Sequence, residues 1–128
     1  MKKNTSAKVL IIESDEGARY LYDIALRFQN LDVRTASTMA EGMDIALVFK
    51  PELLLFDQMV TDFDSVNLLE RLEGDVPDNM PIIIATNLSD EDHKEKEEVK
   101  ILNAFEYLVA GKHTVGDVIR SSRKAVKL

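Results

Sequence analysis

Residues 51–57 read Pro51-Glu52-Leu53-Leu54-Leu55-Phe56-Asp57, with four consecutive apolar side chains followed directly by a carboxylate. An apolar run without polar alternation is typical of a strand buried on both faces, as in a parallel sheet. Two other runs share this pattern, Val9-Leu10-Ile11-Ile12 and Pro81-Ile82-Ile83-Ile84-Ala85. The sequence therefore predicts a buried parallel sheet, and weaker strand patterns at residues 32–36 and 105–109 complete a set of five strands.

Helical spacing separates these strands, because apolar residues recur three or four positions apart between them. Ser89 followed by Asp92 indicates the N-terminal cap of one more helix. Alternating strands and helices predict right-handed crossovers and a three-layer α/β sandwich. The residues with helical spacing are Ala18, Leu21, Ala25 and Phe28; Met39, Met43, Ala46 and Leu47; Val66, Leu69 and Leu72; and Val115, Val118, Ile119, Ser122 and Val126.

The composition argues against several classes of function. The formal net charge is -7 and no stretch gathers Lys or Arg into a stripe, so we expect no direct nucleic-acid partner. The absence of cysteine excludes disulfides and thiolate metal sites, and His93 and His113 are expected to be solvent-exposed without metal or catalytic roles. No apolar stretch approaches the roughly 20 residues that cross a bilayer, and no secretory signal is visible. We therefore expect a cytoplasmic protein without a membrane partner.

Acidic residues follow the predicted strands where the strands end. Glu13 and Asp15 come after the first strand and Asp57 after the third, and the carboxyl ends of parallel strands meet at one edge of the sheet. Carboxylates held close together repel one another and usually need a divalent cation, for which magnesium is suited. A carboxylate at a strand tip can also accept a phosphoryl group, which the hydroxyl of Thr86 at the next strand end could hydrogen-bond. For Glu13 and Asp15, stabilisation of a helix N-terminus is an alternative explanation that stays open.

Four segments in this order and at this spacing resemble the CheY-like receiver domains of two-component response regulators. The resemblance covers the chain from about Lys8 to the end. It implies a flavodoxin-like (βα)5 fold with five parallel strands in the order 2-1-3-4-5, and a single receiver domain over residues 1–128 in which residues 1–7 are a flexible N-terminal extension. The segments are Lys8-Val9-Leu10-Ile11-Ile12-Glu13-Ser14-Asp15-Glu16, Pro51-Glu52-Leu53-Leu54-Leu55-Phe56-Asp57, Pro81-Ile82-Ile83-Ile84-Ala85-Thr86 and Ala104-Phe105-Glu106-Tyr107-Leu108-Val109.

The resemblance assigns roles to individual residues. Asp57 matches the phosphorylated aspartate, Thr86 the switch hydroxyl and Tyr107 the switch aromatic, although Tyr107 as a plain core residue is an open alternative. For magnesium, the resemblance implies the carboxylates of Glu13 and Asp57 and the backbone carbonyl of Met59.

The sequence also departs from the family pattern. Ser14 stands where a second acid is expected, so we expect weaker magnesium binding, with Asp15 as a candidate replacement ligand. Ala110 stands where the family has an essential lysine. Lys112 is a candidate substitute, because its flexible side chain could reach back past Gly111.

The resemblance implies a phosphorelay receiver. A sensor histidine kinase or a histidine phosphotransfer protein would donate a phosphoryl group to Asp57, with magnesium assisting. The signal would pass to a downstream protein through the face formed by the fourth helix, the fifth strand and the fifth helix, and a homodimer is a further possibility. Beyond promoting its own phosphorylation and dephosphorylation, the domain is not expected to be an enzyme.

Two other functions compete with this interpretation. Ser14 and Ala110 favour a degenerate pseudo-receiver, which would be an interaction module that works without phosphorylation. A flavin-binding domain of the same topology would need a loop that cradles phosphate after the first strand. The acids within residues 13–16 would repel a phosphate there, which argues against a flavin site.

Overall fold

The computed structural model describes residues 6–57, 80–86, 106–109 and 113–127. The helices expected after the third and fourth strands lie outside these residues, as do Met59, Ala110 and Lys112. No helix in the described ranges is long and apolar enough to cross a membrane. The strands are β1 (Lys8–Ile12), β2 (Asp32–Ala36), β3 (Leu53–Phe56), β4 (Ile82–Thr86) and β5 (Glu106–Val109), and the helices are α1 (Glu16–Arg27), α2 (Met39–Phe49) and α5 (Val115–Ala125).

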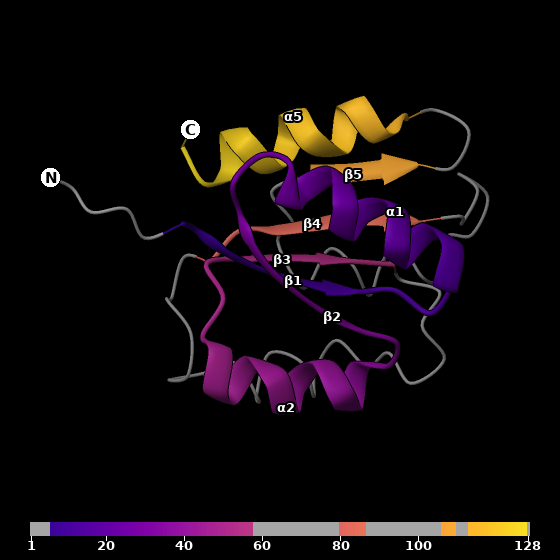
Figure 1. The fold of residues 1–128 in the computed structure, drawn as a ribbon. Coiled ribbons are helices and arrows are strands. Elements are labelled where there is room, and N and C mark those ends of the chain that lie inside the picture. The colour runs from indigo at the N-terminus through magenta and orange to yellow at the C-terminus, as the bar shows by residue number, and fades with distance from the viewer. Residues whose placement is uncertain (1–5, 58–79, 87–105, 110–112, 128) are drawn as a thin grey trace, which may run out of the picture.

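The strands form one parallel sheet in the order β2-β1-β3-β4-β5 (Figure 1). This order confirms the predicted fold class and topology. Strand β1 lies between β2 and β3, and its last residue, Ile12, is in register with Ala36 of β2 and Phe56 of β3. All four residues of β3 are buried, as its unbroken apolar run predicts.

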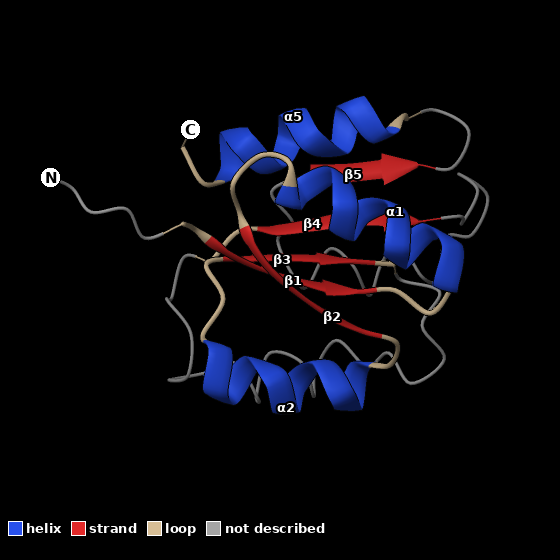
Figure 2. Ribbon diagram, in the orientation of Figure 1, coloured by secondary structure: helices blue, strands red, loops and turns tan. Residues whose placement is uncertain are grey.

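Helices cover both faces of the sheet: α1 and α5 lie on one face and α2 on the other (Figure 2). Because side chains alternate along a strand, each strand contributes to two separate cores. The core under α2 contains Leu10, Ile12, Leu54, Phe56, Ile84, Met39, Met43 and Ala46. The core under α1 and α5 contains Val9, Ile11, Leu53, Leu55, Ile83, Leu26 and Val118.

Side-chain caps fix the start of each described helix. Asp15 caps α1, Thr38 caps α2, and Thr114 forms a reciprocal capping box with Asp117 at the start of α5. A cap satisfies backbone N–H groups that the first helical turn leaves unpaired. The caps therefore fix the residues at which α1 and α2 begin, and hence where the loops after β1 and β2 end.

The buried face of α1 coincides only partly with the residues whose spacing predicts the helix. Leu21 is 49% exposed and Phe28 is 82% exposed, whereas Leu26 is buried and Tyr22 is half-buried against the core. This helix carries apolar side chains around most of its circumference, so periodicity alone does not select the face that packs on the sheet.

Two residues at the ends of described segments bear on smaller expectations. The carbonyl of Ala7 accepts a hydrogen bond from the N–H of Asp32 at 2.9 Å, so Ala7 is bonded to β2, while the flexible extension over residues 1–7 stays a prediction. His113 is half-buried rather than solvent-exposed, and it directly precedes Thr114, the N-terminal cap of α5.

Candidate functional site

Two carboxylates meet where the central strands end. Glu13 follows β1 and Asp57 follows β3, and the preceding residues, Ile12 and Phe56, are register partners. The N–H of Asp57 donates to the carbonyl of Ile12 at 3.1 Å, and the N–H of Glu13 donates to the carbonyl of Ala36 at 3.0 Å. Each side chain is only 4% exposed. The sheet hydrogen bonding thus continues into both acids and fixes them side by side.

The environment of this acid pair favours a bound proton in the absence of a cation. Burial raises the pKa of Glu13 from its usual 4.5 to about 7, and the charge of Asp57 and a hydrogen bond between the two side chains act in the same direction. The N–H of Asp15 donates to Oε2 of Glu13 at 3.1 Å and opposes this rise. A cation at the pair would stabilise its fully ionised form.

The donor chemistry of the acid pair fits magnesium. Mg²⁺ usually takes one or two carboxylates from a protein and keeps several waters, and it relieves the repulsion between buried acids. Among the described residues, no three Asp, Glu or His side chains form a group that could hold a metal. The backbone carbonyl of Met59, the third predicted ligand, lies outside the described residues.

Asp15 is close in sequence to the acid pair but has another structural role. Its carboxylate accepts a hydrogen bond from the N–H of Ala18 at 2.8 Å, as the N-terminal cap of α1, and the side chain is exposed. The helix-stabilising explanation left open by the sequence therefore applies to Asp15. Its role as a metal ligand stays a prediction. The neighbouring Ser14, which stands where a second acid was expected, is exposed.

Arg19 of α1 holds the loop that follows β1 and carries Glu13, a role that the sequence did not reveal. Its Nη1 donates to the carbonyl of Glu13 at 2.9 Å and to that of Ser14 at 3.5 Å. Tyr22 lies about one turn further along α1. Burial raises the pKa of its hydroxyl, and the negative charges of Glu13 and Asp57 raise it further, so Tyr22 lies within electrostatic reach of the acid pair. Single polar residues within a helix give no spacing signal, which explains why both were missed.

The other predicted site residues are placed by their backbone alone. Thr86 is the last residue of β4, the neighbour of β3, so its backbone reaches the same edge of the sheet as Asp57. Tyr107 lies in β5 opposite Ile84 of β4. Their switch roles stay predictions, as does the substitution by Lys112, which lies outside the described residues.

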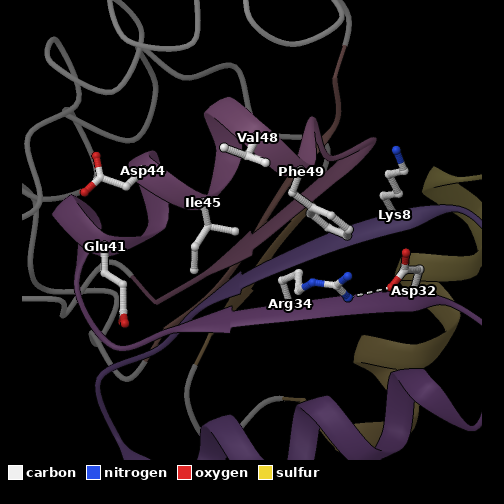
Figure 3. A pocket seen from close by; sticks show the side chains of 8 residues that line it. All are labelled: Lys8, Asp32, Arg34, Glu41, Asp44, Ile45, Val48 and Phe49. Carbon is white, nitrogen blue, oxygen red and sulfur yellow. Dashed lines mark hydrogen bonds and ion pairs between the residues drawn. The ribbon is translucent and has the colours of Figure 1, made fainter.

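A groove of about 670 Å³ lies away from the acid pair, between β2 and α2 (Figure 3). Lys8 and Asp32 lie at the amino ends of their strands, whereas the acids follow the carboxyl ends. The guanidinium of Arg34 lies 4.7 Å from the ring centroid of Phe49 and bonds Asp32 at 2.7 Å. The groove is therefore a separate feature of mixed charge. Its lining residues are Lys8, Asp32, Arg34, Glu41, Asp44, Ile45, Val48 and Phe49.

Comparison with known proteins finds related proteins, although no family model matches the chain. The cell cycle transcriptional regulator CtrA of Caulobacter vibrioides is 28% identical over 89 residues, which are 70% of this chain but only 38% of CtrA. The chain thus matches little more than a third of that protein.

Two solved structures align along nearly the whole chain. The CheY-like response regulator receiver domain protein of Methanospirillum hungatei superposes with a TM-score of 0.81 at 18% identity, over 96% of this chain and 95% of that one. The signal receiver domain of a modulated diguanylate cyclase from Desulfovibrio desulfuricans gives a TM-score of 0.77 at 27% identity, with the same coverage of 96% and 95%.

Proposed function

We propose that Asp57 is the phosphoryl acceptor of this chain, which is a CheY-like receiver domain of the response-regulator kind. The observation that carries this proposal is the burial of Asp57 beside Glu13 at the ends of two adjacent central strands. Phosphoryl transfer asks a protein mainly for positioning and charge neutralisation, and a carboxylate fixed by the sheet meets the first requirement.

The proposed donor is a phosphohistidine of a sensor histidine kinase or of a histidine phosphotransfer protein. A carboxylate oxygen of Asp57 attacks phosphorus, the bond between phosphorus and the histidine nitrogen breaks, and an acyl phosphate forms. Magnesium held by Glu13 and Asp57 would neutralise charge on the phosphoryl oxygens. Arg19 supports this step indirectly, since it holds the carbonyls of Glu13 and Ser14 and hence the loop beside Asp57.

The proposed output is a change in protein binding. The hydroxyl of Thr86 would hydrogen-bond the new phosphoryl oxygens. Tyr107, on the neighbouring strand β5, would then repack. Lys112 would take the place of the lysine that the family has at the position of Ala110. A downstream protein would read this change on the face that includes β5 and α5. We place this activity in the cytoplasm, without membrane or nucleic-acid partners and without enzymatic activity beyond self-phosphorylation and dephosphorylation.

A specific observation also supports a second candidate, the pseudo-receiver. The carboxylate of Asp15 caps α1, and Ser14 carries no charge, so the described residues bring two acids together rather than three. A site with fewer acids binds magnesium less strongly, and the domain would then act as an interaction module independent of phosphorylation.

Intact-mass spectrometry after incubation with Mg²⁺ and acetyl phosphate distinguishes these candidates. A working receiver gains one phosphoryl group, and Asp57→Asn abolishes the gain because it removes the nucleophile. The matched control, Asp44→Asn on the exposed side of α2, should retain the full gain. If the folded wild-type protein gains no mass, the pseudo-receiver is the better description of this chain.

A further inference from the structure

The outward face of α1 carries an apolar seam. Tyr20, Leu21, Ile24 and Phe28 are four of the six large apolar side chains exposed in the described part of the chain, and Phe28 is 82% exposed. Together with Gly17, three of them follow a spacing of four, three and four residues, at positions 17, 21, 24 and 28. This is the spacing of residues along the contact line of two packed helices. We call Gly17, Leu21, Ile24 and Phe28 the α1 seam.

The α1 seam is not needed to attach α1 to its own domain. Leu26 is fully buried and Tyr22 packs on the core, so the inner face of the helix already provides that contact. Phe28 follows the last helical residue but keeps helical backbone angles, with φ -63° and ψ -19°. It therefore extends the seam by one residue beyond the end of α1.

We propose that the α1 seam binds a second copy of this chain, with the two α1 helices antiparallel about a two-fold axis that passes midway between Leu21 and Ile24. In this arrangement Leu21 lies opposite Ile24 of the second copy, and Phe28 lies opposite Gly17 of the second copy. The same patch then contacts itself, as a two-fold interface requires. The proposal does not depend on phosphorylation of Asp57.

The sizes of the seam residues favour the antiparallel arrangement. Gly17 is exposed, and the nearest atom to a β-carbon built there is Oδ2 of Asp15 at 3.5 Å, so the space above it is open. The ring of Phe28 from the other copy can fill that space, with a large side chain packing against a small one. A parallel pair would instead set two glycines face to face and leave a void between them.

A cation–π contact at the flank supports the same arrangement. Tyr20 borders the α1 seam on the side of Arg27, and the antiparallel pairing brings Tyr20 near Arg27 of the second copy. The side chain of Arg27 is half-exposed, and its guanidinium is held in place by Asp23 at 2.5 Å and by the carbonyl of Val33, to which Nη2 donates at 2.8 Å. A fixed guanidinium over an aromatic ring is favourable, and the protein already makes such a contact between Arg34 and Phe49.

Sedimentation equilibrium of the unphosphorylated protein tests the proposal. One helix face per copy makes a small interface, below about 1,200 Å², so we expect a weak dimer that requires high protein concentration. Leu21→Gln combined with Phe28→Gln should weaken self-association at least about tenfold, since the largest apolar contacts are removed. The matched control is Leu47→Gln with Val48→Gln on α2, whose side chains are 42% and 86% exposed, and it should dimerise like the wild type.

Cross-linking tests the geometry independently, because the chain contains no natural cysteine. In the antiparallel pair, position 17 lies next to position 28 of the other copy, whereas two copies of position 17 are roughly 16 Å apart at 1.5 Å per residue. Gly17→Cys mixed with Phe28→Cys should therefore form a disulfide-linked dimer, and Gly17→Cys alone should not.

Two outcomes would overturn the proposal. A monomer at every concentration, with no cross-link in the mixture, would show that the seam does not bind a second copy and would leave it to a helix of another protein. A dimer that survives Leu21→Gln with Phe28→Gln would place self-association on a different face. Circular dichroism of each variant confirms that the fold is retained.

Discussion

Glu13 shows how one buried side chain makes stability depend on pH. Its pKa is about 7 in the folded protein and near 4.5 when unfolded, so the folded state binds more protons between these values. In metal-free buffer, the free energy of unfolding should therefore fall as pH rises from 4.5 to 7 and then level off. Each pKa unit is worth about 1.4 kcal/mol, which limits the loss to about 3 kcal/mol.

Glu13→Gln isolates this contribution, because glutamine imitates the protonated acid. Urea denaturation with EDTA should find this variant close to the wild type at pH 4.5 and more stable than it at pH 8. The control Glu16→Gln, at an exposed position in the first turn of α1, should show no such change with pH. An equal difference between Glu13→Gln and the wild type at both pH values would contradict the assignment.

Ser122 illustrates the cost of a polar atom in an apolar place. Its hydroxyl oxygen in α5 is buried and has no hydrogen-bond partner in the described structure. Ser122→Ala should raise the free energy of unfolding by about 1 kcal/mol, since the penalty for the unpaired hydroxyl disappears. Ser121 is also buried but does have an interaction partner, so Ser121→Ala should not give this gain in the free energy of unfolding. Thermal denaturation of both variants measures the difference.

The packing of α2 on β1 depends on a glycine. A β-carbon at Gly42 would lie 2.7 Å from Cγ1 of Ile12, which is itself fully buried. Gly42→Ala should therefore cost roughly 1–3 kcal/mol of unfolding free energy, although alanine is the better helix former. Gly17→Ala, in open space on α1, should gain up to about 1 kcal/mol at protein concentrations too low for self-association. A gain in both variants would mean that α2 moves away from β1 at little cost.

The elements also show which features the sequence could predict. The unbroken apolar runs of β1, β3 and β4 can fit only a strand covered on both faces, so these strands were predicted to within one residue. The face of α1 could not be predicted in the same way. Tyr20, Leu21, Tyr22, Ile24, Leu26 and Phe28 surround that helix, and only packing against the sheet selects Leu26 and Tyr22 for burial.

The site was predictable as far as it follows from strand order. Once β1 and β3 are neighbours, Glu13 and Asp57 must lie together. The capping bond of Asp15 and the reach of Arg19 back to two carbonyls depend on local side-chain geometry, which no spacing rule contains. The raised pKa of Glu13 likewise depends on burial in the folded molecule.

At the scale of the whole molecule, magnesium binding should be measurable as stability. A ligand that binds only the folded state at ten times its dissociation constant adds about 1.4 kcal/mol to the unfolding free energy. We expect Mg²⁺ to raise the melting temperature more at pH 8 than at pH 5, because it competes with the proton on Glu13. Asp57→Asn should remove most of this effect. Equal melting temperatures with and without Mg²⁺ at pH 8 would argue against a cation at the acid pair.

The ladder bonds that hold Glu13 and Asp57 have a consequence for exchange with deuterated solvent. Their amide hydrogens continue the hydrogen bonding of β1 and β3 by one residue, and each of these strands has a neighbouring strand on both sides. Such amides become accessible only when the whole sheet opens, so they should be among the slowest to exchange. Chemistry at these residues would then take place on the most persistent part of the backbone, and a bound ion or phosphoryl group would shift the lifetime of the entire fold.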